Sequence, residues 1–535
     1  MTRSALQEAM ACWAALMGES CVLGANEASA QYACGSQRGI AAALRPRTPD
    51  GIQEIVRIAA HHRIPLHPIS TGRNWGYGGA TPPADHCVLL DLSGLNRIIE
   101  IDADLGTATI EPGVTQGQLH AYLQARNLPF MVPTTGAGPS VSLVGNALER
   151  GYGITPHADH FSAVMGLEAV LPDGSMYCSR LSALGGTRID RGYKWGIGPY
   201  LDGLFSQSNL GVVTQMTIAL AQRPAHIEAF YIFLKDNSRL APALQVLRGL
   251  LRSMGGLLGG VNVLNGYRLA SMTCDYPTNV LERGTPLQAK ELADLLRNNR
   301  LGSYLIVGSV YGEPSVARAA VAAVLQHFAS CSSRRVRLTR SRAEWLAKLA
   351  RFFPRTGKAL GFGQDQAARM ISALNLIEGI PDDVALRLPY WKSGAALPSD
   401  LTQALQNGER GLIWYAPLVP LTTDAVQAFE AMVSRVCLAH GFEPLITLTS
   451  LSDRCFDSSV PLLFDGRDPA DHARAQQCFD ALFSEGRKLG YVPYRMGAQT
   501  FDRLDAQNDP ALTLARHIKQ TLDPHGILSP GRYNL

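Results

Sequence analysis

In the first part of the chain, hydrophobic residues recur with the period of a strand in some segments and with the period of a helix in others. The segment ALRPRTPDGIQEIVRIAAHHRIPLHPIS predicts a strand, a turn, a helix and a second strand. Asp50 is expected to cap this helix, and Asp173-Gly174 in AVMGLEAVLPDGSMYCSRL predicts a hairpin turn. Residues 41–225 are therefore expected to form one α+β unit of domain size. The apolar face of the helix consists of Ile52, Ile55, Val56, Ile58 and Ala59.

From residue 226 onward the pattern predicts longer helices. Strand-like runs such as GSYLIVGSVYG and RGLIWYAPLVP alternate with them, which favours an antiparallel sheet covered by helices. The tail from Tyr494 carries a helix of its own. The fold class predicted for the chain is α+β, with a second, α/β unit built on an antiparallel sheet. The helices of that unit are expected over residues 242–254, 287–299, 315–330, 422–440 and 468–489.

Composition narrows the functional classes. With 535 residues, the chain is too long to fold around one ordinary hydrophobic core. The net charge of +4 and the lack of a basic tract argue against nucleic acid, with Arg334-Arg335 read as a solvated pair. No apolar run is long enough for a membrane span, and residues 1–17 read as a helix rather than a signal peptide. The ten cysteines form no CxxC pair, which argues against zinc and indicates a reduced, cytoplasmic protein.

The first chemical signal is the glycine-rich segment PISTGRNWGYGG, residues 68–79, which follows a predicted strand. Glycines permit positive φ, and successive backbone N–H groups in such a turn can cradle phosphate oxygens. Ser70, Thr71 and Asn74 add hydrogen-bond donors, and Arg73 adds charge. The spacing is not GxGxxG and no helix opens from the loop, so a Rossmann site is a poor interpretation. A purely structural turn is the alternative.

Two further segments carry many small residues, VPTTGAGPSVSLVGNALERGYGITPHADH at 132–160 and KWGIGPYLDGLFSQSNLGVVT at 194–214. Backbone with few side chains can approach a flat polar cofactor closely. In this order, the glycine loop, these segments and the tail LDPHGILSPGR strongly resemble the vanillyl-alcohol oxidase and p-cresol methylhydroxylase family. The resemblance covers most of the chain and is weak over residues 226–380.

The resemblance implies a two-domain flavoenzyme that holds FAD. Residues 1–225, with a core of 41–225, would form an FAD-binding domain of the p-cresol methylhydroxylase type. Residues 226–493 would form the cap or substrate domain, and 494–535 would return to the FAD domain. A homodimer is also implied. The residues expected at FAD are Ser70, Thr71, Gly72, Arg73, Asn74, Tyr77, Gly78, Pro133, Thr134, Gly138, Gly145, Asn146, Arg150, Gly151, Gly153, Ile154, His160, Gly211, Val213 and Arg532.

In the family, two tyrosines and an arginine hold the oxygen of a phenol substrate as phenolate, and the matching residues are Tyr77, Tyr494 and Arg495. A phenol has a pKa near ~10, and two O–H donors with a guanidinium favour its anion. The phenolate would drive hydride from the benzylic carbon to the flavin. The alternative is that Tyr77 packs on the flavin and Tyr494 is a core residue.

Two positions depart from the family in acid–base chemistry. Thr134 follows Val132-Pro133 where vanillyl-alcohol oxidase places an aspartate, and a hydroxyl is a poor base at neutral pH. A histidine pair of the family maps onto Asp457-Ser458. Asp457 is therefore a candidate acid–base residue, with a surface turn residue as the alternative. Pro133 would lie over the flavin edge, which is compatible with oxygen as electron acceptor.

The histidine that attaches the flavin in the oxidase branch maps onto Leu412, and Tyr390 is the nearest candidate for the tyrosyl link of the other branch. We therefore expect FAD to be bound non-covalently. His160 could touch the flavin or could be a structural residue, and His157 with His160 lacks a third ligand for a metal.

The sequence predicts an FAD-dependent oxidase or dehydrogenase acting on a small aromatic substrate, with a para-substituted phenol as the first hypothesis. Oxygen or another electron acceptor would be its second partner. A non-phenolic alcohol, amine or heterocycle is the second hypothesis. A flavin-binding protein without turnover is the third.

Overall fold

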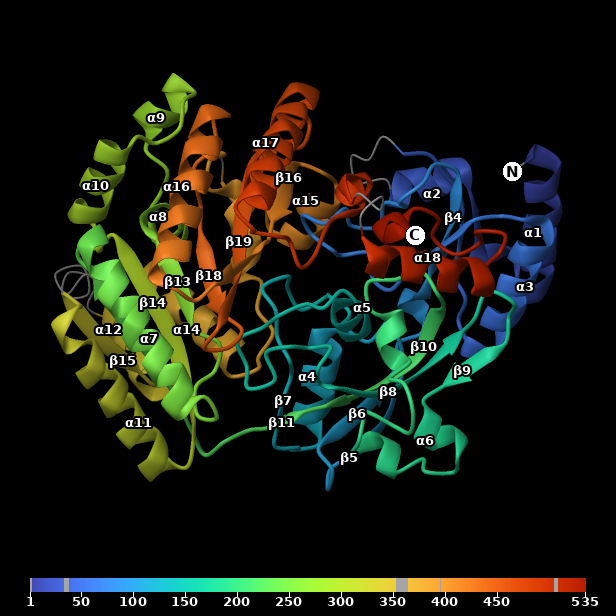
Figure 1. Cartoon of the computed structure of the whole chain (residues 1–535), viewed down its shortest axis with the longest axis horizontal. Coiled ribbons are helices and arrows are strands. Elements are labelled where there is room, and N and C mark those ends of the chain that lie inside the picture. The colour runs from blue at the N-terminus through green and yellow to red at the C-terminus, as the bar shows by residue number, and fades with distance from the viewer. Residues whose placement is uncertain (1, 33–37, 353–363, 395, 505–508) are drawn as a thin grey trace.

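A computed structural model describes residues 2–32, 38–352, 364–394, 396–504 and 509–535. Figure 1 shows two halves, with the sheets of the first 225 residues on the right and a large sheet from the middle of the chain on the left. Helix α18 (Pro510–Leu522), near the C-terminus, lies on the right again. No helix among the described residues is both long enough and apolar enough to cross a membrane.

A four-stranded sheet begins the first half, in the order β1-β2-β4-β3. β4 pairs in parallel with both β2 and β3, whereas β1 is antiparallel to β2. Every residue of β2 and β4 is buried, as is typical of parallel strands covered on both faces. Trp13 and Ile55 belong to the core between this sheet and its helices. The elements are β1 (Val22–Gly24), β2 (Ile40–Leu44), β3 (Leu66–Ile69), β4 (Cys87–Asp91), α1 (Arg3–Met17), α2 (Ala25–Tyr32) and α3 (Ile52–His62).

A five-stranded antiparallel sheet completes the first half, in the order β5-β6-β10-β8-β9. The predicted hairpin is confirmed, because β8 pairs antiparallel with β9 and Gly174 has φ +81° at the turn. A short pair, β7 (Phe130–Met131) with β11 (Ala221–Gln222), leads out of it. The other elements are β5 (Ile98–Asp102), β6 (Thr107–Ile110), β8 (Val164–Val170), β9 (Met176–Cys178), β10 (Val212–Ala219), α4 (Gln116–Ala125), α5 (Leu143–Leu148) and α6 (Arg180–Ala183).

The second half is built on an eight-stranded antiparallel sheet, in the order β15-β12-β14-β13-β18-β19-β16, with β17 also paired to β19. Four long helices share a hydrophobic core with one face of this sheet. The strands are β12 (His226–Leu234), β13 (Asn262–Asn265), β14 (Tyr304–Gly312), β15 (Arg334–Leu338), β16 (Arg410–Tyr415), β17 (Leu418–Pro420), β18 (Thr447–Ser450) and β19 (Cys455–Asp465).

The long helices that the apolar pattern predicted for this half are confirmed. The four that cover the sheet are α7 (Leu240–Met254), α11 (Pro314–His327), α16 (Thr423–Ala439) and α17 (Pro469–Lys488). The others are α8 (Gly266–Thr273), α9 (Thr278–Arg283), α10 (Ala289–Asn298), α12 (Arg340–Phe352), α14 (Gln364–Ile377) and α15 (Leu401–Gln406).

One local prediction is wrong. Asp50 does not cap the helix α3, because it lies inside a 3-10 turn, Pro49–Gly51, that runs directly into that helix. Gly51 occupies the position before the helix, and no side chain caps it there.

The tail is held against the first half by buried polar contacts. Lys519 of α18 forms an ion pair with Asp523 (2.6 Å) and donates to the carbonyl oxygens of Asn209 (2.8 Å) and Leu528 (2.9 Å). Leu528 also forms a parallel bridge with Leu66 of β3. The last residues of the chain therefore lie beside the strand that leads into the glycine loop.

Candidate cofactor and substrate site

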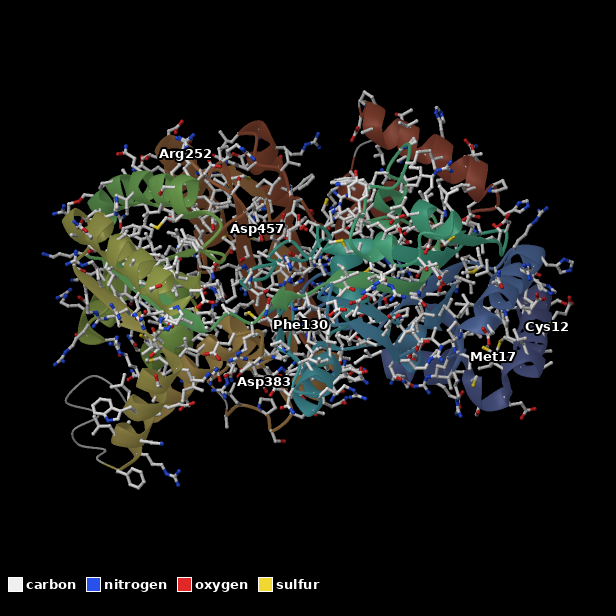
Figure 2. All side chains as sticks on the ribbon, turned by 90° about the horizontal axis from the view of Figure 1, so that it is seen from below. Cys12, Met17, Phe130, Arg252, Asp383 and Asp457 are labelled. Atoms are coloured by element: carbon white, nitrogen blue, oxygen red, sulfur yellow. The ribbon has the colours of Figure 1, made fainter. Side chains whose placement is uncertain are left out.

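A cavity of about 1530 Å³ is lined by residues of both halves and of the tail. It is larger than the ~300–1,000 Å³ typical of a pocket for one small ligand, so a long cofactor and a substrate can share it. Asp457, one of its lining residues, lies between the two halves in Figure 2. Its walls include the glycine loop, one face of the eight-stranded sheet and the residues around Arg495.

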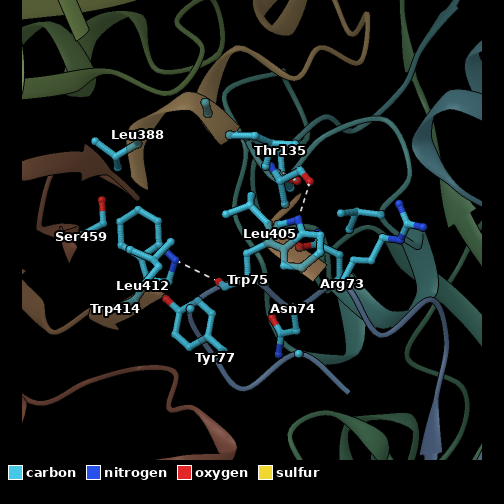
Figure 3. A pocket seen from close by; sticks show the side chains of 18 of the residues that line it. Arg73, Asn74, Trp75, Tyr77, Thr135, Leu388, Leu405, Leu412, Trp414 and Ser459 are labelled. Carbon is cyan, nitrogen blue, oxygen red and sulfur yellow. Dashed lines mark hydrogen bonds between the residues drawn. The ribbon is translucent and has the colours of Figure 1, made fainter. Parts of the chain in front are cut away.

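The glycine loop follows β3 and is closed by contacts with the second half. Gly72, Gly76 and Gly78 have φ values of +65°, +76° and +103°, which side chains rarely adopt. A Cβ at Gly76 would lie 2.3 Å from the Trp414 ring, so only glycine fits there. Trp414 Nε1 also donates to the Trp75 carbonyl at 3.0 Å, as Figure 3 shows.

Around this loop, backbone segments approach one another too closely for side chains. A Cβ at Gly145 would lie 2.3 Å from Ser70 Oγ, and one at Gly153 would lie 2.3 Å from the Thr134 carbonyl oxygen. The result is a cradle of backbone groups and small hydroxyls along one wall of the cavity. Such a wall fits the polar length of FAD, which needs N–H and O–H donors at its phosphates and close backbone approach elsewhere.

Most residues expected at FAD line this cavity. Those in its wall are Ser70, Thr71, Gly72, Arg73, Asn74, Tyr77, Gly78, Thr134, Gly145, Asn146, Gly153, Ile154, Gly211, Val213 and Arg532. Five others lie outside the wall, namely Pro133, Gly138, Arg150, Gly151 and His160.

Two of these five have clear partners. Arg150 donates from Nε and Nη2 to Ser206 Oγ, at 3.1 and 3.0 Å. His160 is buried and accepts a hydrogen bond from the Asn146 amide, and burial lowers its pKa to about 3, so the ring is neutral at pH 7. Since Asn146 lines the cavity and His160 does not, the structure favours the alternative in which His160 is a structural residue that supports Asn146.

The three residues expected at a phenol oxygen converge, although Tyr77 and Tyr494 are separated by most of the chain. The Arg495 guanidinium lies 4.3 Å from the centre of the Tyr77 ring, and its Nη2 donates to Asn74 Oδ1 at 2.5 Å. Tyr494 is close enough to Tyr77 and Arg495 for their charges to affect its pKa, which burial raises well above its ordinary value. We call Tyr77, Tyr494 and Arg495 the tyrosine–arginine cluster.

Asp457 completes this corner of the cavity. It is only 9% exposed and lies within strand β19, which excludes the surface-turn alternative. Burial raises its pKa to about 8, although a hydrogen bond from Tyr494 and the charge of Arg495 act in the opposite direction. Its Oδ1 has no partner among the described residues. A carboxyl group with a pKa near neutrality and a free oxygen is suited to proton transfer.

Glu149 is a site residue that sequence reasoning missed. Its carboxylate forms an ion pair with Arg532, accepts from Tyr533 Oη at 2.8 Å, and lies 3.8 Å from Arg495 Nε. It thereby holds the last residues of the chain beside Arg495 of the tyrosine–arginine cluster. No local pattern marks Glu149, since its partners come from residues more than 300 positions away.

The remaining candidates occupy distinct parts of the wall. Thr134 Oγ1 donates to the Leu376 carbonyl at 2.8 Å, so its hydroxyl joins the two halves. Leu412, onto which the family's attachment histidine maps, lies in the cavity wall beside Gly76 of the glycine loop. Tyr390 also lines the cavity, and its buried hydroxyl has no partner in the described part of the chain.

Comparisons with known proteins agree with this geometry. Residues 40–178 match the family model of an FAD binding domain. The whole chain is 35% identical to the 1'-carboxy-chondrochloren decarboxylase of Chondromyces crocatus, of which it covers 98%. Over 92% of its length it is 29% identical to the 4-cresol dehydrogenase (hydroxylating) flavoprotein subunit of Pseudomonas putida, of which it covers 87%.

Solved structures show the same architecture along the whole chain. The crystal structure of p-cresol methylhydroxylase with substrate bound matches with a TM-score of 0.86 and 27% identity, covering 100% of this chain and 98% of that one. The 4-ethylphenol oxidase from Gulosibacter chungangensis shares the fold with a TM-score of 0.88, at 24% identity and the same coverage. The predicted fold and the predicted cofactor, FAD, are thereby confirmed. This chain belongs to the vanillyl-alcohol oxidase and p-cresol methylhydroxylase family and is an FAD-dependent oxidoreductase.

Proposed function

We propose that this enzyme takes hydride from the benzylic carbon of a para-substituted phenol. The observation that carries the proposal is the convergence of Tyr77, Tyr494 and Arg495 at one wall of the cavity. Two O–H donors and a guanidinium around one oxygen favour a phenolate over a phenol. A phenolate releases electron density toward its para carbon, which makes hydride loss from the adjacent carbon easier.

FAD, when bound, supplies the acceptor for that hydride. The protein's residues hold the ring and move the proton. Arg495 would neutralise the phenolate, while Tyr494 would hand the phenol proton to Asp457, whose pKa of about 8 suits a proton acceptor. The oxidised ring is a quinone methide, and water adding to its benzylic carbon gives an alcohol. A second oxidation would give an aldehyde or ketone.

A second course for the same intermediate is supported by the relative from Chondromyces crocatus, which is named a decarboxylase. Where the carbon next to the benzylic one bears a carboxylate, the bond to that carboxylate can break instead. Its electron pair forms the side-chain double bond and restores the phenolate, and CO₂ leaves. Hydride loss comes first in both courses, so the tyrosine–arginine cluster has the same role in each.

Anaerobic mixing of the FAD-loaded enzyme with 4-ethylphenol should bleach the flavin absorbance, because hydride transfer needs no acceptor beyond the flavin. Stopped-flow absorbance measures the rate, and benzyl alcohols and amines serve as the comparison set. Bleaching by alcohols or amines but not by phenols would favour a non-phenolic substrate. A flavin that no compound bleaches would indicate a binding protein without turnover.

FAD is proposed to be held without a covalent link, because Leu412 stands at the position of the family's attachment histidine. Acid precipitation should therefore leave a yellow supernatant, measured by its absorbance spectrum. Flavin that stays with the precipitated chain would contradict the proposal. In that case Tyr390, whose free hydroxyl lines the cavity, is the residue to test by a Tyr390→Phe variant.

The resemblance also supports separate roles for the two domains, one in binding FAD and one in covering the substrate. Residues 1–225 and 494–535 would bind FAD, and residues 226–493 would cap the substrate. Oxygen or another electron acceptor would reoxidise the flavin, and the enzyme would be a homodimer. A reduced, cytoplasmic location is supported by the free thiols of all nine cysteines in the described residues, Cys34 lying outside them.

A further inference from the structure

The face of the eight-stranded sheet that is turned away from the four long helices carries polar residues beside the apolar Leu264, Leu305 and Val307 where it lines the cavity. Its register places Asn262 of β13 opposite Thr449 of β18, and Thr449 opposite Asp457 of β19. In the next row, Thr447 lies opposite Ser459, which Figure 3 shows among the cavity residues. Residues two apart on a strand share a face, so both rows line the cavity.

Arg268 extends this polar surface away from Asp457. It lies in α8, and its guanidinium donates from Nε to Thr447 Oγ1 at 3.2 Å and from Nη1 to Ser271 Oγ at 3.1 Å. Thr447 and Asp457 are diagonal neighbours on the sheet, which separates them by about 7–8 Å. An aromatic ring with a short side chain bridges such a gap. One end of it can therefore lie at the tyrosine–arginine cluster and the other at Arg268.

The charge of Arg268 has no counter-ion in the described part of the chain. Burial lowers its pKa to about 10, so it is still a cation at neutral pH. Both hydrogen-bond partners of its side chain are neutral hydroxyls, and Asp275, the acidic residue of the same wall, forms no ion pair with it. A largely buried cation without an anion is costly, and a bound anion would remove that cost.

A second arginine adds to the positive charge of this wall. Arg369 of α14 donates from Nη1 to the Met272 carbonyl at 3.2 Å, and its Nε has no partner among the described residues. Arg369 therefore reinforces the preference of this part of the cavity for an anion.

We propose that Arg268 binds a carboxylate on the para side chain of the substrate. The planar fork of a guanidinium matches the two oxygens of a carboxylate, and here Thr447 and Ser271 hold the fork in place. The inference rests on the proposed function, which puts the phenol oxygen at the tyrosine–arginine cluster. It narrows the substrate class to 4-hydroxyphenyl compounds with an acidic side chain, and it places the carboxylate that a decarboxylative course would lose.

Binding of two compounds that the flavin does not oxidise tests this inference. Titration calorimetry of the FAD-loaded enzyme should show 3-phenylpropanoate binding roughly 10- to 100-fold more tightly than 3-phenylpropanamide. The Arg268→Met variant should lose this preference and bind the amide as the unchanged enzyme does. Arg268→Lys should keep part of it. Arg387→Met, which removes an exposed arginine of the same cavity, is the matched control and should keep all of it.

Three results would overturn the inference. They are equal binding of acid and amide by the unchanged enzyme, an equal loss of both in Arg268→Met, and loss of FAD from that variant, which would mean that the charge serves the cofactor. The flavin-bleaching assay is independent of these titrations. If phenols fail to bleach the flavin but acid binding depends on Arg268, the proposed function fails and the carboxylate site stands.

Discussion

Replacing Arg495 with methionine should slow flavin reduction by 4-ethylphenol about 100- to 1,000-fold. The reason is that Arg495 is the only cation beside Tyr77 and Tyr494 in the described residues, and it would carry the charge of the phenolate. Losing a preorganised group that stabilises developing negative charge costs about this much in other enzymes. Anaerobic stopped-flow absorbance at the flavin band measures the rate directly.

The pH dependence separates this role from simple support of the fold. Without Arg495, the substrate itself must ionise, so the rate of the variant should climb with pH toward the phenol's own pKa near ~10. Arg495→Lys retains the charge and should recover part of the rate. Arg435→Met, in an exposed ion pair with Glu485, is the control and should behave as the unchanged enzyme. A variant that is slow at every pH to the same extent would speak against phenolate stabilisation.

Replacing Asp457 with asparagine should slow flavin reduction by about 100-fold or more, the usual contribution of a general base. In the unchanged enzyme the carboxyl group has a pKa of about 8, so it is mostly protonated at pH 7 and becomes a base as the pH rises through 8. The rate should therefore increase across that window and then level off. In Asp457→Asn this inflection should disappear, as measured by stopped-flow rates between pH 6 and pH 10.

The same shift has a consequence for stability. The folded pKa of about 8 lies above the ordinary value of 3.8, so between these pH values the folded state binds more protons than the unfolded one. The contribution of Asp457 to the free energy of unfolding is thus complete below pH 4 and is lost as the pH rises through 8. In urea unfolding, the free energy of unfolding should decrease less between pH 5 and pH 8 in Asp457→Asn than in the unchanged enzyme. Asp453→Asn, in an ion pair with Arg252, is the matched control. If the inflection of the flavin-reduction rate near pH 8 persists in Asp457→Asn, another group is responsible for that inflection.

The local pattern of the chain determined much of the architecture. Helical spacing predicted α3 and the long helices of the second half, because one apolar face must be buried against a sheet. The Asp173-Gly174 turn predicted the β8–β9 hairpin, since positive φ at that point suits glycine. The glycine loop likewise predicted a backbone cradle. In each case the information lies within about twenty consecutive residues.

From the sequence we could predict the set of elements, the segments expected at FAD and, through a family resemblance, the tyrosine–arginine cluster. The tertiary structure was needed to show that Asp457 is buried beside Tyr494, that Glu149 joins the last residues of the chain to Arg495, and that Arg268 has no counter-ion among the described residues. The physical reason is that burial and pKa depend on neighbours from distant strands. Sheet register, rather than any local period, brings Thr447 and Asp457 together and places Arg268 within reach of the same substrate.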